Sequence, residues 1–271
     1  MNRLSLNQIT TKRWSVPEAV RGCADQGVEW IGLWRDKIAE VGAAETARLL
    51  AEHGVRASSV CRGGFFTGVT PEGAAVDGVG MTREAIDETA TVGADVLVLV
   101  VGGIADGDLL SSRQRVADAV GELAPYARER GVRLALEPLH PMQCAERSVL
   151  STLDQALEIA QEHPSDAVGV IVDEFHVWWD PRVEESIAKA AGRIAGFHVC
   201  DQQVPITDGL MARSLPGTGP IDHRRLRSCV EEAGYDGPVE VEVFDADLWQ
   251  QPGDEVLRQV ITAYEEHVIP R

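Results

Sequence analysis

Two apolar runs of the sequence each end in a carboxylate, and a histidine follows three positions further on. Glu137 closes the first run and precedes His140, and Asp173 closes the second and precedes His176. An ionised carboxylate at the end of an apolar strand costs free energy unless a cation or hydrogen-bond donors compensate it. In a parallel α/β barrel, the residue that closes a strand points into the mouth where active sites are built. These two endings therefore indicate a metal site or an acid–base site.

Two later runs carry further polar side chains near the same end. His198 lies in the run 194–199, and Glu240 and Glu242 lie in the run 239–244. Because side chains alternate along a strand, both glutamates face inward, with Glu240 one layer deeper and Glu242 nearer the mouth. This position favours Glu242 as the member of the site and leaves Glu240 as the alternative. Three carboxylates and one imidazole suit Mn²⁺, Mg²⁺ or Co²⁺ at least as well as Zn²⁺.

The runs that carry these residues belong to an alternation of apolar strands and helical patterns along the whole chain, which is typical of a parallel sheet. We expect eight strands and eight helices, and the 271 residues are close to the ~250 of a typical (β/α)8 barrel. The prediction is an α/β fold, a single (β/α)8 TIM barrel domain over residues 1–271, with the active site at the C-terminal ends of the strands. The expected strands are 4–9, 29–33, 55–60, 95–101, 132–137, 168–173, 194–199 and 239–244.

Two glycine-rich stretches, 61–80 and 201–220, show neither helical nor strand periodicity. Loops of this length in a compact domain are usually functional, so we expect both to act as lids. Arg62 or Phe66 of the first stretch could enter the pocket, and an ordinary glycine-rich turn is the alternative. Trp34 closes the second strand and is expected at the mouth.

Composition limits the class of protein. The net charge of −18 argues against a nucleic-acid surface, which would need a basic stripe, and fits a protein acting on a small ligand. Hydrophobic residues make up 44% of the chain, which is typical of a globular protein, and no run approaches membrane-spanning length. The five cysteines contain no CxxC pair, so we expect reduced thiols and a cytoplasmic location.

In this order and at these strand ends, five motifs resemble the xylose-isomerase-like sugar isomerases and epimerases, a superfamily that includes inosose isomerases, hydroxypyruvate isomerase and tagatose-type 3-epimerases. The resemblance covers nearly the whole chain. The motifs are Leu-Glu-Pro-Leu at 136–139, Asp-x-x-His at 173–176, His-x-x-Asp at 198–201, Pro-Gly-Thr-Gly-Pro-Ile-Asp at 216–222 and Gly-Tyr-Asp-Gly-Pro-Val-Glu-Val-Glu at 234–242.

The resemblance implies that Glu137, Asp173, His198 and Glu242 bind one divalent metal ion, with Mn²⁺ as the first choice and Mg²⁺, Co²⁺ or Zn²⁺ as alternatives. It also makes Glu137 and Glu242 the acid–base pair on opposite sides of the substrate. The implied reaction removes a proton next to a carbonyl through a metal-held enediolate, and the proton returns to the same carbon or to its neighbour.

The resemblance also implies substrate contacts. His176 would contact a substrate oxygen, and Asp201 would orient His198 or a bound water. Arg213 matches the region where relatives place a substrate-binding arginine. His140 is expected as a polar pocket residue, because four ligands already suffice for the metal.

The implied activity is isomerisation or epimerisation of a sugar or an inositol-type ketose, with no nucleic-acid or membrane partner and with homo-oligomerisation left open. A lyase on the same barrel is the alternative, because it shares the first proton abstraction. It would be a dehydratase, or a C-glycoside-cleaving enzyme that acts on a 3-keto sugar with a small β-rich partner subunit. An apurinic endonuclease would need extra histidine ligands and a basic face, and neither is visible in the sequence.

Overall fold

The computed structural model describes residues 3–206 and 208–270, and its central feature is a closed parallel barrel. The strand order is β1-β10-β7-β6-β5-β4-β3-β2, and every neighbouring pair in the barrel is parallel. The predicted (β/α)8 fold is confirmed. The strands are β1 Leu4–Asn7, β2 Trp30–Trp34, β3 Arg56–Gly64, β4 Val96–Val100, β5 Arg133–Leu136, β6 Val168–Asp173, β7 Ile194–Val199, β10 Val239–Val241 and, outside the barrel, β8 Asp201–Gln202 and β9 Arg213–Ser214.

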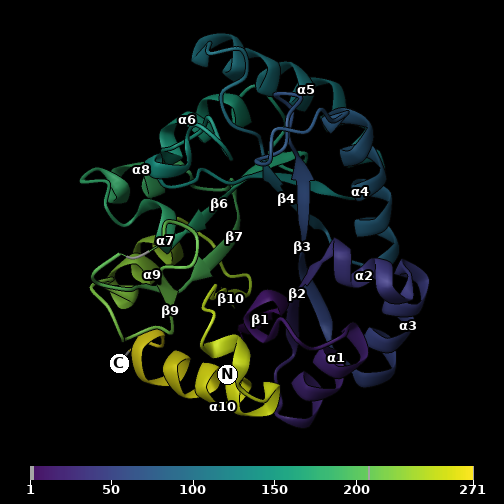
Figure 1. Ribbon diagram of the computed structural model, residues 1–271, viewed down its shortest axis with the longest axis vertical. Coiled ribbons are helices and arrows are strands. Elements are labelled where there is room, and N and C mark those ends of the chain that lie inside the picture. The colour runs from purple at the N-terminus through teal and green to yellow at the C-terminus, as the bar shows by residue number, and fades with distance from the viewer. Residues whose placement is uncertain (1–2, 207, 271) are drawn as a thin grey trace.

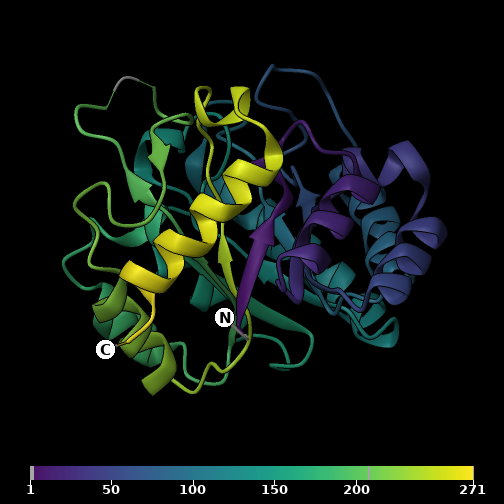
Figure 2. The ribbon, with the colours of Figure 1, turned by 90° about the horizontal axis from the view of Figure 1, so that it is seen from below.

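Helices form an outer ring around the strands (Figure 1). The first and last parts of the chain meet where the barrel closes: Leu4 of β1 pairs with Val239 of β10, and α10 lies beside β1 and α1 (Figure 2). The helices are α1 Val16–Asp25, α2 Arg35–Val41, α3 Ala43–His53, α4 Gly78–Val92, α5 Leu109–Glu129, α6 Leu153–Ala160, α7 Glu174–Val177, α8 Val183–Lys189, α9 His223–Glu232 and α10 Gly253–Ala263, with 3₁₀ turns η1 Gln8–Thr11, η2 Pro141–Gln143 and η3 Leu248–Gln250 and a π-helical turn η4 Tyr264–Val268.

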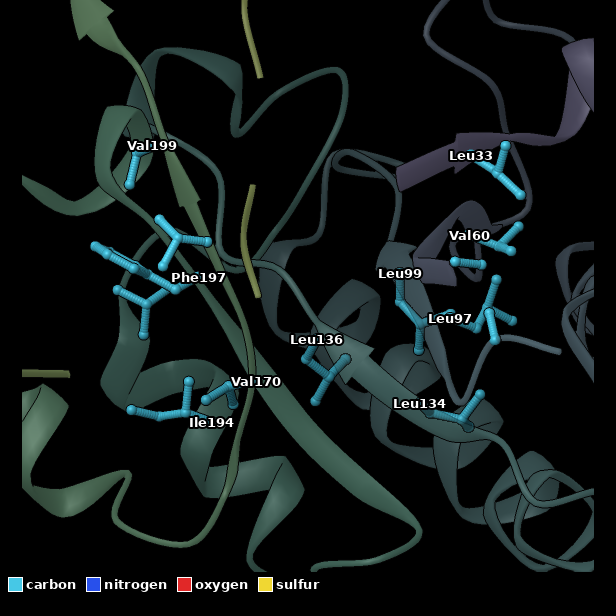
Figure 3. Packing of buried hydrophobic residues seen from close by; sticks show 14 of the residues in the cluster. Leu33, Val60, Leu97, Leu99, Leu134, Leu136, Val170, Ile194, Phe197 and Val199 are labelled. Carbon is cyan, nitrogen blue, oxygen red and sulfur yellow. The ribbon is translucent and has the colours of Figure 1, made fainter. Parts of the chain in front are cut away.

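The buried apolar residues form one main cluster and two small ones, because the barrel strands are buried on both faces. Leu97 and Leu99 of β4 and Leu134 of β5 pack toward the helices as part of the main cluster (Figure 3). Val98 of β4 and Ala135 of β5 belong to a separate small cluster. This alternation places the even and odd positions of each strand on opposite faces, as strand geometry requires. The strand ends are therefore held in fixed positions by packing on both sides.

The structure differs from the predicted elements at several places: β3 continues to Gly64, into the stretch expected to be a loop, and β10 ends at Val241 instead of residue 244. Between β2 and β3 the sequence pattern predicts one helix, about 38–53, but the chain forms two, α2 and α3, which meet at Gly42 with a φ of 90° that favours glycine. Strand β1 gives way to the turn η1, the short helix α7 follows β6 directly, and the expected loop 201–220 contains the β8–β9 hairpin. None of the described helices is both long and apolar enough to cross a bilayer.

Candidate active site

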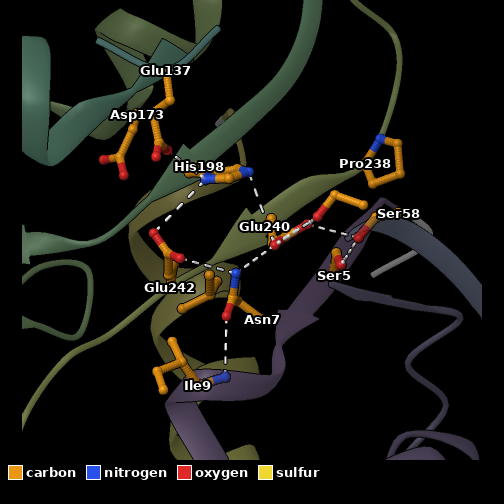
Figure 4. Close-up of polar contacts among 12 residues, drawn as sticks. Ser5, Asn7, Ile9, Ser58, Glu137, Asp173, His198, Pro238, Glu240 and Glu242 are labelled. Carbon is orange, nitrogen blue, oxygen red and sulfur yellow. Dashed lines mark hydrogen bonds and ion pairs between the residues drawn. The ribbon is translucent and has the colours of Figure 1, made fainter. Parts of the chain in front are cut away.

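Four strand-end side chains converge at the C-terminal mouth of the barrel. Glu137 follows the last residue of β5, Asp173 ends β6, His198 lies in β7 and Glu242 follows the last residue of β10. Asp173 pairs directly with His198 across the sheet, which sets the two side chains at the same height. One ligand atom from each residue lies within 4.8 Å of the others, and all four residues are buried (Figure 4).

The environment of these atoms fits a divalent cation. His198 Nδ1 lies 3.4 Å from Glu137 Oε1 and 3.8 Å from Glu242 Oε2. Glu137 Oε1 and His198 Nδ1 are buried and have no hydrogen-bond partner among the described residues. Buried polar atoms are costly when they have no partner, and buried charges are normally paired or coordinate a metal. Three carboxylates and one imidazole are a hard donor set that would satisfy such an ion.

The Arg213 guanidinium supplies a positive charge inside this group. Its Nη1 atom lies 2.9 Å from both Asp173 Oδ2 and Glu242 Oε2, and its Nη2 atom lies 2.9 Å from His176 Nε2. The ring of Phe175 lies 4.6 Å from the guanidinium carbon. The β8–β9 hairpin delivers Arg213 to the mouth from a segment expected to be an irregular loop.

The two predicted acid–base glutamates have opposite electrostatic surroundings. Burial raises the pKa of Glu137 to about 7, and the charges of Glu242 and Asp173 act in the same direction. Burial would also raise the pKa of Glu242, but Arg213 and His198 outweigh it and lower that pKa to about 2. The carboxyl groups are therefore not equivalent, because only one of them contacts the arginine.

Glu240 lies one layer below the four-residue group, as its parity predicts. Its Oε1 atom accepts a 2.6 Å hydrogen bond from Asn7 Nδ2, and its Oε2 atom accepts one of 2.6 Å from Ser58 Oγ. Ser59 Oγ also donates to this carboxylate, and His198 Nε2 lies 3.9 Å from Oε1 (Figure 4). Glu240 is therefore buried below the mouth, in a layer where β1 and β3 carry polar side chains.

Trp34 stands at the mouth and is tied to the same polar layer. Its Nε1 atom donates to Asn7 Oδ1 at 2.8 Å, and its ring packs edge-on against Phe244 at 5.8 Å between centroids. Below it, Gly32 makes room for Glu240, since a Cβ atom at Gly32 would lie 2.0 Å from Glu240 Oε1. The absence of a side chain at Gly32 is therefore a packing requirement of the buried carboxylate.

The two histidines that follow the strand-end carboxylates have different positions. His176 is buried and lines the small central cavity that lies among the four-residue group, Trp34 and Arg213. Burial lowers its pKa to about 3. His140 is not among the residues that line this cavity. Its side chain accepts from the Met142 backbone N–H and packs on Trp179, while its own backbone N–H donates to His176 Nδ1 at 3.0 Å. His140 thus positions His176 instead of entering the pocket.

Among the described residues Asp201 makes no hydrogen bond to His198, and the alternative that it orients a bound water stays a prediction. Its Oδ2 atom accepts from the backbone N–H groups of Gly217 and Gly219 at 3.1 and 2.7 Å and lies 3.2 Å from His223 Nε2. His223 Nδ1 lies 2.6 Å from Glu174 Oε2. Asp201 therefore holds the loop after β9 against the barrel. His223 was missed in the sequence, although it directly follows the Pro-Gly-Thr-Gly-Pro-Ile-Asp motif.

The central cavity at the mouth of the barrel is small. Its volume is about 20 Å³, whereas sites for small molecules usually exceed roughly 300 Å³. Glu137, Glu242, Trp34, His176 and Arg213 all line it. Of the two open alternatives in the first loop, Arg62 lines the cavity and Phe66 belongs to the core. Arg147 and Leu210 also line the cavity and were not predicted, because each lies in an irregular segment without a periodic pattern.

Comparison with known proteins gives one family model, described as xylose isomerase-like TIM barrel, which matches residues 20–267. Inosose isomerase of Bacillus subtilis is 32% identical over 146 residues, which are 52% of this chain and 50% of that protein. Ketose 3-epimerase of Arthrobacter globiformis is 28% identical over 220 residues, 77% of this chain and 70% of that protein. 3-Dehydroshikimate dehydratase of Pseudomonas aeruginosa is 31% identical over 157 residues, 55% of this chain and 23% of that protein. These homologues are enzymes, and the match spans about half the length of the inosose isomerase.

Among solved structures, a protein of Sinorhizobium meliloti 1021 is 38% identical, covers 99% of both chains and superposes with a TM-score of 0.92. The IolI protein, solved with a bound zinc atom, is 22% identical, covers 98% of both chains and has a TM-score of 0.81. At this low identity, the likeness to the IolI protein shows only that the two chains share a fold.

Proposed function

The chain belongs to the xylose isomerase-like TIM barrel family, and on that premise we propose that it is a divalent-metal-dependent isomerase or epimerase of a sugar or an inositol-type ketose. The observation that carries the proposal is the buried group of three carboxylates and one imidazole at the barrel mouth. The names of the inosose isomerase and the ketose 3-epimerase support the substrate class.

In this proposal Glu137, Asp173, His198 and Glu242 hold the metal ion, with Mn²⁺ preferred because oxygen donors dominate the set. The ion, when bound, supplies Lewis-acid polarisation of the substrate carbonyl. Arg213 keeps Asp173 and Glu242 in place, since its guanidinium contacts both. The IolI protein, which has the same fold and was solved with a zinc atom, supports metal binding and leaves the choice of ion to experiment.

Glu137 and Glu242 carry the proton in the proposed reaction. Each reaches the cavity from a different strand, so one carboxylate can take a proton from the carbon beside the carbonyl while the other returns it. Return to the same carbon gives an epimer, and return through the neighbouring carbon gives the aldose–ketose isomer. Trp34 and Phe244 form an apolar wall at the mouth that would limit water access to the reacting carbon.

The test is proton exchange at substrate carbons. Metal-loaded protein is mixed in D₂O with an inosose, a ketohexose and the corresponding 3-epimer, and NMR follows deuterium at the carbon next to the carbonyl. Deuterium uptake without loss of water and without cleavage of the substrate supports an isomerase or epimerase. No exchange with any keto-polyol, in protein shown to contain the metal, would refute the proposal.

A dehydratase is the second candidate, because a relative of this chain is a 3-dehydroshikimate dehydratase. Both reactions begin with removal of the same kind of proton, and a dehydratase then expels a β-hydroxyl group. Mass spectrometry of the product separates them, since loss of water identifies the dehydratase. For this reason 3-dehydroshikimate belongs in the substrate panel.

The proposal extends to the organisation of the chain and its location. We place residues 1–271 in one barrel domain, supported by the pairing of β1 with β10. A cytoplasmic enzyme is supported by the five free cysteines, of which Cys23, Cys61 and Cys200 are buried. Mass spectrometry with and without reductant checks the thiol state.

A further inference from the structure

Two arginines line the central cavity without a partner for their charge. Arg62 lies in β3, and Arg147 lies in the segment after η2. Neither guanidinium makes a hydrogen bond or an ion pair within residues 3–206 and 208–270, and Arg147 Nε is a buried atom without a partner. Arg213, in the same cavity, contacts Asp173 and Glu242 through Nη1 and His176 through Nη2, and only its Nε atom is buried without a partner.

The missing partner is informative because a partly buried guanidinium is costly when its hydrogen bonds are unmade. The chain has 43 acidic residues, so carboxylates are plentiful. Surface arginines use them, as in the contacts of Arg35 with Glu88 and Arg115 with Asp106. Within the cavity, the available acids serve the four-residue group instead. The positive charges of Arg62 and Arg147 are thus left for a group from outside the chain.

The two guanidinium groups also act on each other. Burial lowers the pKa of Arg147, and the charge of Arg62 lowers it further. The ring of Phe65 lies 4.8 Å from the guanidinium carbon of Arg62 and supports that group. Glu72, exposed on the neighbouring loop, forms no ion pair with either arginine within the described residues, although the charges of both lower its pKa. An anion between the two would relieve their repulsion.

We propose, on the basis of the proposed function, that the substrate carries an anionic oxyacid group, a carboxylate or a phosphate, which Arg62 and Arg147 bind. The planar guanidinium fork matches both kinds of anion. Arg62 also lines a neighbouring cleft of about 330 Å³, which shares Trp34 and Cys61 with the central cavity. The anionic group therefore lies toward this cleft, while the reacting carbon lies at Glu137 and Glu242.

The test compares ligands that differ in charge. Calorimetry measures the Kd of quinate against myo-inositol and of fructose 6-phosphate against fructose, with wild-type protein at low and high salt. We expect the anionic member of one pair to bind about tenfold tighter or more, as expected for a charged hydrogen bond. High salt should reduce the preference. The pair that shows the preference identifies the group as carboxylate or phosphate.

Variants locate the effect. Arg62→Gln and Arg147→Gln should each lower the affinity for the anionic ligand about tenfold and leave the neutral ligand unchanged, and Arg147→Lys should retain part of the preference. Arg48→Gln on the outer surface of α3 removes the same charge and should change neither. If Arg147→Gln does not fold, the same affinities are measured with Arg62→Gln alone, since Arg62 is only half-buried.

Equal affinities within both pairs would overturn the inference, and so would a preference that survives in both Gln variants. Failure of the proposed function has a different signature. In that case the protein shows no metal content and no proton exchange, while the ratio of the two Kd values stays measurable.

Discussion

Glu240 and Glu242 are two positions apart on β10, and their height in the barrel separates their surroundings. Asn7 donates to both carboxylates, but Glu242 joins the four-residue group and contacts Arg213, whereas Glu240 accepts hydrogen bonds from Ser58 and Ser59. Because the two residues share a face, only their distance from the mouth distinguishes them. This difference gives a paired experiment on chemically identical substitutions.

Glu242→Gln should lose about 10²- to 10⁴-fold in turnover, because proton transfer by a positioned carboxylate contributes that much. Glu240→Gln should keep turnover and lose roughly 1–3 kcal/mol of stability, since it disturbs buried hydrogen bonds. The measurements are kcat, metal content and thermal midpoint, and kcat is compared at equal metal occupancy. An inactive Glu240→Gln beside an active Glu242→Gln would reassign the acid–base pair.

The metal ligands give a second prediction at the residue scale. Glu137→Gln, Asp173→Asn and His198→Ala should each lose the bound divalent ion, because every one removes a donor from the group. The wild-type chain should bind about one ion. Atomic emission of dialysed protein measures the content, and Arg48→Gln serves as a surface control. Full occupancy in all three ligand variants contradicts the assignment.

At the scale of elements, the β8–β9 hairpin is the segment that completes the site. It carries Arg213, and Leu210 in its connection lines the cavity. Because the cavity of about 20 Å³ is too small for a sugar, we predict that the hairpin and the glycine-rich stretch 61–80 open for substrate to enter.

Hydrogen–deuterium exchange should therefore be fast in peptides covering these two segments and should slow when metal and substrate are added. Peptides from α5, on the outer ring, should not change. The expectation fails if the two segments exchange as slowly as the barrel strands and do not respond to ligand.

The contact of His223 with Asp201 and Glu174 joins α9, the loop after β9 and α7. Burial would lower the pKa of His223, but its hydrogen bonds to Asp201 and Glu174 outweigh this and raise the pKa from 6.5 to about 9. A raised folded-state pKa means that the stabilisation is fully present below pH 6.5 and is lost as the pH rises through 9. Burial raises the pKa of Glu174 from 4.5 to about 7. This group therefore also lowers the stability of the fold as the pH rises, in the range between 4.5 and 7.

We expect the thermal midpoint of wild-type protein to fall between pH 7 and 9.5 more than that of His223→Gln. The corresponding difference in the free energy of unfolding is at most about 3 kcal/mol, from the size of the pKa shift. Calorimetry of both proteins at the two pH values gives the result, and groups elsewhere cancel in the comparison. Parallel curves for the two proteins would show that His223 is not charged in the fold.

For the whole molecule, a metal at the barrel mouth would link four strands and should stabilise the fold. A ligand at 100 times its Kd adds about 2.7 kcal/mol, which is roughly 5–10 °C for a chain of this size. Metal-loaded protein should therefore melt higher than protein treated with EDTA. His198→Ala should show a much smaller shift, and an equal shift in both proteins would place the stabilising ion elsewhere.

The sequence by itself determined the barrel and the positions of its eight strands, although several strand ends differ by two to four residues. Each strand is a short apolar run whose residues alternate between two buried faces, so its location and the inward parity of Glu240 and Glu242 follow from local pattern. The family resemblance was confirmed by the matching model. The roles assigned to Glu137, Asp173, His198 and Glu242 remain predictions, although the fold brings their side chains together.

Only the tertiary structure decided the contacts made by irregular segments. Asp173 ends β6 and Asp201 lies two residues beyond β7, so both are close to the end of a barrel strand. Asp201 nevertheless accepts hydrogen bonds from the backbone of Gly217 and Gly219, 16 and 18 residues further on. Arg147 and Arg213 reach the cavity from segments whose paths depend on what they pack against, and no periodic pattern marks such residues. A strand fixes its side chains through local geometry, whereas a loop takes its course from long-range contacts that the sequence does not place next to each other.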